Sequence, residues 1–134
     1  MIKFYRTDHK VLSEITEYED NMWVCMTKPT VDETKLIAED FEIDLADVRA
    51  ALDDEESSRV EVEDGYTLIL VDIPSIEMRN EREAYTTIPL GIILVKDILI
   101  TVCAEDTPVL DAFIEAKVKE FSTKKRMRFM YQIL

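Results

Sequence analysis

The sequence predicts an α+β domain, a three-layer α/β/α sandwich around a mixed, mainly antiparallel sheet of about seven strands. The first observation is the spacing of the hydrophobic residues along the chain. It alternates between the two-residue period of strands and the longer period of helices, and it predicts three strands, two helices, four strands and two helices in that order. The second is that several strand-like stretches are apolar throughout, so both faces of the sheet need cover from helices. The third is size, because 134 residues with 47% hydrophobic content suit one core.

Three short strands open the chain. Alternation at Ile2 and Phe4, and the pair Val11 and Ile15, predict two strands joined by a tight turn. Residues 22–26 are almost continuously apolar, which predicts a third and more deeply buried strand.

Two helices come after these strands. Thr30 and Glu33 have the spacing of a capping box, in which each side chain accepts a hydrogen bond from the other residue's backbone N–H. Asp44 can cap the free amides of a second helix, which ends in an acidic run. The apolar positions of the two helices are Val31, Leu36, Ile37 and Phe41 in the first, and Leu45, Val48, Ala51 and Leu52 in the second.

A β-hairpin comes next. Residues 59–63 alternate strictly, Asp64-Gly65 is a favourable two-residue turn, and residues 66–73 are largely apolar. These features predict two antiparallel neighbours.

A second hairpin is predicted over residues 85–95 and 98–103, after a polar connection over residues 75–84. Proline has no N–H for the sheet, so Pro74 and Pro89 indicate strand ends or edges.

The chain closes with two helices. Thr107 caps the first, with Pro108 in its first turn, and its apolar face consists of Leu110, Phe113, Ile114, Val118 and Phe121. The last helix is predicted from about Thr123, with Met127, Met130, Tyr131 and Leu134 on one side. We therefore divide the chain into an α+β domain over residues 1–121 and the start of a further helix over residues 122–134, which continues beyond the chain because no Gly or Pro ends it.

Charge is concentrated at two places. The 16 basic and 29 acidic residues give a net charge of −13. Residues 32–64 hold 14 acids and three basic residues, whereas residues 117–134 hold six basic residues and one acid. Such an acidic surface disfavours non-specific nucleic-acid binding and suits divalent cations or basic partners. The basic segment 124–128 is either a solvated helix face or a contact for an acidic partner.

No residue pattern supports an enzyme. The single histidine, His9, lies in a predicted turn, and Cys25 and Cys103 lie in apolar stretches typical of buried thiols in a reducing compartment. No nucleophile elbow, phosphate-binding loop or dinucleotide motif is present in the sequence. The most apolar window, residues 86–104, is broken by proline, glycine and a Lys-Asp pair, so no membrane span is predicted.

The candidate metal ligands form one acidic run, Asp53, Asp54, Glu55 and Glu56. Hard cations prefer oxygen ligands, and adjacent carboxylates concentrate negative potential. The run lacks the alternating ligands and central glycine of an EF-hand. It is therefore either a solvated acidic turn or a weak divalent-cation site completed by water or by another chain.

Several segments, in their order along the chain, resemble the cytoplasmic amino-terminal domain of the CorA-type magnesium transporters. They are residues 23–30 (WVCMTKPT), 36–43 (LIAEDFEI), 52–61 (LDDEESSRVE), 66–71 (YTLILV) and 99–102 (LITV).

The resemblance implies a regulatory, non-catalytic funnel domain of a divalent-cation channel, which senses Mg²⁺ and gates the pore. It implies a homo-oligomer, a pentamer in the full-length family, on the cytoplasmic side of the membrane. The family's magnesium-sensing carboxylate corresponds to Ala50, and this sequence also has Ser57-Ser58 where the family has Arg-Pro. We therefore expect Asp53 and Asp54 to take over part of the sensing role and Mg²⁺ to bind weakly.

An acidic α+β interaction or adaptor domain without a transport role is the alternative function. The two hypotheses differ in the sequence expected after Leu134, because a transporter continues into a long charged helix, two apolar segments of about 20 residues and a Gly-Met-Asn signature.

Overall fold

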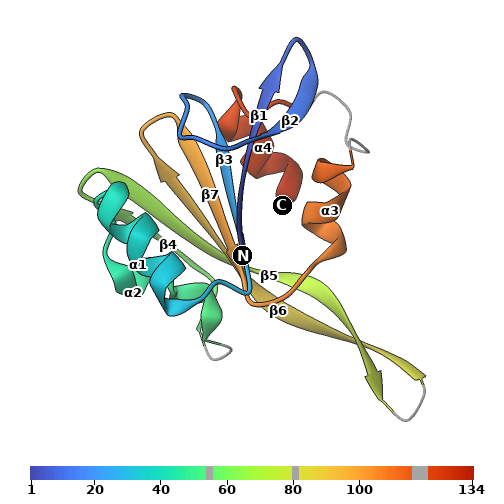
Figure 1. The fold of residues 1–134 in the computed structure, drawn as a ribbon. Helices are drawn as coiled ribbons and strands as arrows, with labels where there is room; N and C mark the ends of the chain where they lie inside the picture. Colours follow the sequence, from blue (N-terminus) through green and yellow to red (C-terminus); the bar gives the residue numbers. More distant parts are fainter. Residues whose placement is uncertain (54–55, 80–81, 116–120) are drawn as a thin grey trace.

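A twisted β-sheet forms the middle of the domain, with helices on both sides (Figure 1). The computed structural model describes residues 1–53, 56–79, 82–115 and 121–134. Its elements are, in chain order, β1 (Ile2–Asp8), β2 (Val11–Ile15), β3 (Trp23–Thr27), α1 (Val31–Asp40), α2 (Leu45–Val48), the 3₁₀ turn η1 (Ala50–Leu52), β4 (Arg59–Glu63), β5 (Tyr66–Arg79), β6 (Arg82–Val95), β7 (Ile98–Cys103), α3 (Pro108–Ile114) and α4 (Arg126–Ile133).

Within the described residues, the sheet has seven strands in the order β2-β1-β3-β7-β6-β5-β4. Its neighbours pair antiparallel except for β3 and β7, which run parallel, with Trp23 opposite Leu99 and Thr27 opposite Cys103. The predicted mixed, mainly antiparallel sheet is therefore confirmed. The parallel pair requires a crossover, which α1, α2 and the strands β4 to β6 supply.

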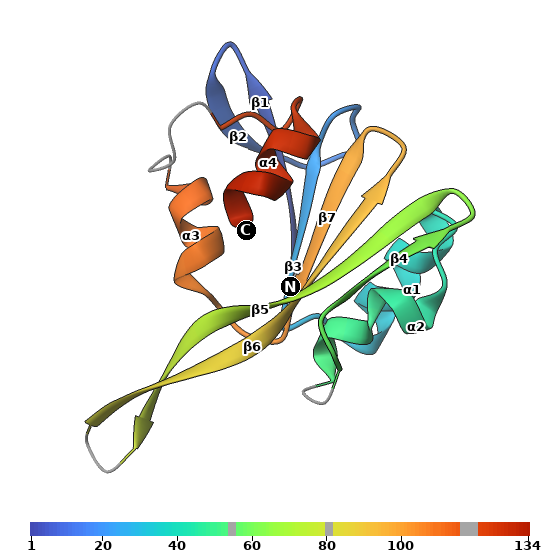
Figure 2. The same cartoon turned by 180° about the vertical axis from the view of Figure 1, so that it is seen from behind.

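Alternation along the central strands divides the core into two halves. On β3, Val24 and Met26 belong to the apolar cluster that contains the residues of α1, α2 and η1. Trp23 and Cys25 belong to the cluster that contains the residues of α3 and α4. Helices α1 and α2 thus cover one face of the sheet and α3 and α4 the other, as Figures 1 and 2 show.

Trp23 is the centre of the α3/α4 side of the core. Its indole Nε1 donates a hydrogen bond of 2.9 Å to the hydroxyl of Thr101 on β7, and both residues are fully buried. Its ring packs edge-on against Phe129 of α4, with centroids 4.9 Å apart. One side chain therefore joins the two central strands to the C-terminal helix.

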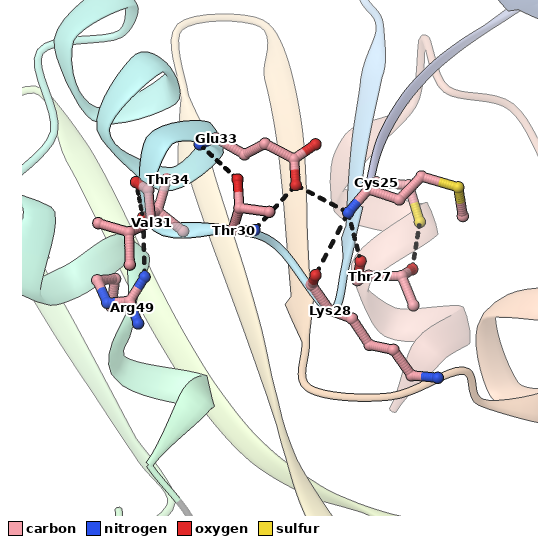
Figure 3. Close-up of polar contacts among 9 residues, drawn as sticks. Cys25, Thr27, Lys28, Thr30, Val31, Glu33, Thr34 and Arg49 are labelled. Atoms are coloured by element: carbon pink, nitrogen blue, oxygen red, sulfur yellow. Dashed lines mark hydrogen bonds and ion pairs between the residues drawn. The ribbon is translucent and has the colours of Figure 1, made fainter.

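The first helix begins as predicted. Thr30 and Glu33 form a complete capping box, drawn in Figure 3. The predicted second helix is shorter than expected: Asp44 caps α2 through the N–H of Ala46, but after four residues the chain tightens into η1. Ala51 of η1 lies so close to the sheet that a Cβ added to Gly91 would be 3.1 Å from its methyl group.

The polar connection predicted over residues 75–84 is wrong. Strands β5 and β6 pair without interruption to the Arg79–Arg82 pair, and their outer part projects from the body of the domain (Figures 1 and 2). Because backbone pairing holds this ribbon, its sequence need not be apolar. Pro74 and Pro89 lie inside the strands, yet at edges: pairing with β4 reaches only Leu70, and pairing with β7 reaches only Leu90.

The C-terminal helices differ most from prediction. Helix α3 ends at Ile114, Val118 lies outside the described residues, and Phe121 is not in a helix. Helix α4 starts at Arg126 and buries Phe129, Met130 and Ile133.

The buried side of α4 is thus rotated from the predicted one. Of the predicted side only Met130 is buried, whereas Met127, Tyr131 and Leu134 are exposed. Two apolar stripes overlap in this segment, and the stripe that carries the large Phe129 ring packs on the sheet.

We expect Thr101→Val to lower the free energy of unfolding by about 1–3 kcal/mol, because it leaves the buried Trp23 N–H without an acceptor in a side chain of nearly the same shape. Urea denaturation measures the change. Thr101→Ser keeps the hydroxyl and is the matched control; a Val variant as stable as the Ser variant would contradict the role of this hydrogen bond.

Candidate functional site

The acidic run predicted from the sequence lies between η1 and β4. Asp53 ends η1, and its carbonyl accepts the N–H of Glu56. The Glu56 carboxylate is 2.5 Å from a guanidinium nitrogen of Arg59. Asp54 and Glu55 lie outside the described residues. Arg59 therefore balances the charge of Glu56.

Ala50, the position at which the resemblance expects a sensing carboxylate, is part of the core. It is 6% exposed and belongs to the apolar cluster beneath α1 and α2. It offers neither an oxygen ligand nor access to solvent.

The structure instead brings together three other carboxylates, Asp47 of α2 and Glu61 and Glu63 of β4. One oxygen from each lies within 4.8 Å of the others, and all three side chains are at least partly accessible. We refer to these residues as the Asp47 cluster.

Sheet register explains why the two glutamates face α2. Glu61 pairs with Leu68 and Glu63 with Tyr66, and both partners point to the α1/α2 side of the sheet. Side chains of directly paired residues share a face. The intervening Val60 and Val62 point to the opposite side and are exposed.

Helix α2, which carries Asp47, is held against α1. Arg49, at its C-terminal end, donates a hydrogen bond of 2.9 Å to the Thr34 hydroxyl, which itself donates to the carbonyl of Val31 (Figure 3). Thr34 is fully buried, so this contact anchors the C-terminal end of α2 to the interior of the domain.

Tyr66 links the cluster to the start of α2. Its hydroxyl donates a 2.5 Å hydrogen bond to Asp47 and accepts one of 3.3 Å from the backbone N–H of Asp44. Burial, followed by the hydrogen bond to Asp47, raises the pKa of Tyr66 to about 12. The neutral phenol is thus kept as a donor that orients one Asp47 oxygen.

The donor set of the Asp47 cluster suits a hard divalent cation. Opposite oxygen ligands lie about 4.2 Å apart around Mg²⁺ and up to about 5.2 Å apart around Ca²⁺. The three carboxylate oxygens lie within 4.8 Å of one another, so they are close enough to surround one partly hydrated divalent cation, with a small inward shift of the side chains for Mg²⁺. The Nε atom of Arg59 donates a 2.6 Å hydrogen bond to Glu61, which offsets part of the negative charge. Both features favour weak binding.

The Asp47 cluster was not predicted from the sequence, although one signal was present. The strict alternation over residues 59–63 already put Glu61 and Glu63 on one face of a strand. Nothing in the sequence indicated that the strand would lie beside Asp47, because that contact depends on how α2 packs.

The remaining titratable candidates do not form a reaction centre in the part of the chain described. His9 is almost fully exposed and lies 3.8 Å from Asp8. Burial raises the pKa of both the Cys25 and the Cys103 thiols, the opposite of what a nucleophilic thiolate requires.

Solved structures of other proteins have the same fold. The soluble domain of CorA from Methanocaldococcus jannaschii is similar with a TM-score of 0.77 and 21% identity, over 99% of this chain and 54% of that one. The complete CorA magnesium transporter from the same organism is similar with a TM-score of 0.73 and 19% identity, over 99% of this chain and 43% of that one. The ZntB cytoplasmic domain from Vibrio parahaemolyticus RIMD 2210633 is similar with a TM-score of 0.71 and 15% identity, over 98% of this chain and 55% of that one.

These matches define an α+β domain shared by the non-membrane parts of CorA and ZntB proteins, and this chain spans about half the length of the structures it matches. A family profile described as CorA-like Mg2+ transporter protein matches residues 18–134, so the chain belongs to the CorA-like family. Comparison with curated proteins gave no significant match. Among the described residues, no helix combines the length and apolarity needed to cross a bilayer.

We expect Tyr66→Phe to flatten the pH dependence of stability in alkaline solution. The pKa of Tyr66 is raised from 10.0 to about 12 in the folded state, so its contribution is complete below pH 10 and is lost as the pH rises through 12. Urea denaturation at a series of pH values measures this slope, with Tyr131→Phe as a control at an exposed hydroxyl. An unchanged slope in the Tyr66 variant would refute the assigned pKa.

Proposed function

We propose that this chain is the cytoplasmic regulatory domain of a CorA-type divalent-cation transporter, and that it senses Mg²⁺ and biases the gating of a pore formed elsewhere in the assembled protein. The convergence of Asp47, Glu61 and Glu63 in a strongly acidic region is the observation that carries the proposal. Membership of the CorA-like family favours this function over an adaptor role.

In this proposal the Asp47 cluster holds the ion, and the acidic run of Asp53, Asp54, Glu55 and Glu56 adds to the local potential. Residues 32–64 carry a net charge of 3 − 14 = −11. Nearby like charges repel and raise the free energy of the compact assembly unless counter-ions lie between them. Bound Mg²⁺ supplies that neutralisation.

Gating follows from the same electrostatics. The full-length protein is proposed to be a homo-oligomer, pentameric as the family resemblance implies, in which acidic regions of neighbouring subunits approach each other. High Mg²⁺ stabilises their contacts, and low Mg²⁺ loosens them and favours the conducting state. A coupling of about 1–3 kcal/mol is typical of such effects. No catalytic role is proposed.

The 134-residue chain should bind Mg²⁺ weakly and through the Asp47 cluster. We expect roughly millimolar affinity, the weak end for oxygen-ligand sites, and loss of saturable binding in Glu61→Gln/Glu63→Gln. NMR titration with MgCl₂ at constant ionic strength measures both.

The matched control is Asp32→Asn/Glu39→Gln, which removes the same charge from exposed positions of α1. Equal losses in the two double variants would attribute binding to the general negative field and contradict a defined site. Tight, stoichiometric binding by the unmodified chain would contradict the weak site proposed here.

In the full-length transporter, removing the acidic run should weaken inhibition by Mg²⁺. The variant Asp53→Asn/Asp54→Asn/Glu55→Gln/Glu56→Gln is expected to shift the inhibition curve of cation flux to higher Mg²⁺, because less charge remains to be neutralised. A flux assay in proteoliposomes measures the shift. If the quadruple variant keeps the wild-type curve while Glu61→Gln/Glu63→Gln shifts it, the run has no part in sensing.

A further inference from the structure

A cavity of about 710 Å³ lies on the side of the sheet opposite the Asp47 cluster, between the β1–β2 turn and the segment that leads into α4. Apolar side chains make up its inner part: Phe113 of α3 is 2% exposed, and Leu12 and Phe121 are partly buried. The cavity is of the size of small-ligand sites, which are about 300–1,000 Å³.

Basic side chains surround the outer part of this cavity. His9 and Lys10 approach from the β1–β2 turn, and Lys124, Lys125 and Arg128 from the opposite wall. Lys124 is 3.7 Å from Asp8, whereas the side chains of Lys10 and Lys125 make no ion pair with any described residue. Although the chain as a whole has a net charge of −13, this group of basic residues produces a local positive potential, which attracts anions.

The two walls are fixed to each other. The N–H of Thr7 donates to the Thr123 hydroxyl at 2.8 Å, and the N–H of Thr123 donates to the Thr7 hydroxyl at 3.0 Å. Both threonines are buried, so the reciprocal pair joins β1 firmly to the start of the α4 segment. The two backbone segments that carry the basic side chains are therefore held at a set separation before any ligand binds, which reduces the entropy lost on binding.

The turn that carries His9 and Lys10 has an uncommon backbone. Their φ angles are +50° and +66°, in the left-handed region that β-hairpin turns usually fill with Asn and Gly. Such strain concentrates at ligand-binding sites. Here it places two basic side chains at the mouth of the cavity.

We propose that this cavity binds an organic phosphate of nucleotide size, with its phosphates on the basic rim and its ring on Phe121 and Leu12, above the buried Phe113. Lysine and arginine are the usual partners of phosphate oxygens, and aromatic side chains stack on planar rings. A membrane surface would suit basic residues on a continuous outer face, whereas these surround a hollow with an apolar interior.

The test is calorimetric titration of the 134-residue chain with ATP in EDTA, so that the acidic face does not bind a metal. We expect saturable binding that weakens at least about tenfold in Lys10→Gln/Lys125→Gln, since a charge-assisted contact is lost on each wall. Lys28→Gln/Lys35→Gln removes the same charge from exposed positions elsewhere and should leave the affinity within about twofold, well under the cost of one lost charged contact.

Two further probes separate the sources of phosphate. Tripolyphosphate should bind at least about tenfold more weakly than ATP, because it cannot use the apolar interior. Equal affinity for the two, unchanged affinity in Lys10→Gln/Lys125→Gln, or no saturable ATP binding would each overturn the proposal. Binding to phosphatidylglycerol vesicles without binding to ATP would also overturn it, in favour of a membrane contact.

Discussion

The parallel pairing of β3 with β7 is the constraint on which the rest of the fold depends. These two strands are central, with neighbours on both edges, and their residues are buried on both faces. A parallel pair cannot close through a short turn. The chain between them must therefore leave the sheet, cover one face as α1 and α2, and return through β4, β5 and β6. The side chain of Trp23 has one hydrogen-bond donor, its indole N–H, and the hydroxyl of Thr101 accepts this bond inside the buried interface between the two strands.

That crossover also separates the charges. The helices that cover the α1/α2 face come from the acidic part of the sequence, so the carboxylates of α1, α2 and the facing side of β4 collect on one side. The other face is covered by α3 and α4, and α4 comes from the basic end of the chain. The proposed cation site and the proposed anion site are thus compatible in one small domain, because the sheet and its two apolar layers lie between them.

Fixed local geometry connects this arrangement to function. Asp47 is set by α2, which Arg49 ties to α1, and its carboxylate is oriented by the Tyr66 hydroxyl. Glu61 and Glu63 are set by strand register. On the opposite side, Thr7 and Thr123 hold two basic walls together. Strand pairing and polar contacts of buried residues thus position the backbone that carries the exposed charged groups, which gives these surface side chains a defined relative geometry.

The sequence alone determined the order of the strands and helices, the helix caps at Thr30, Asp44 and Thr107, and the family resemblance, because each rests on contacts within a few residues or on a short repeating pattern. It also located the acidic region. Only the tertiary structure decided that Asp47, Glu61 and Glu63 meet and that Phe129 rather than Met127 faces the core. A helix with two apolar stripes can bury either of them, and packing against the sheet decides which one is buried. The carboxylates of α2 and β4 come together only when these two elements pack side by side. Packing against distant residues supplies that information, and no local pattern contains it.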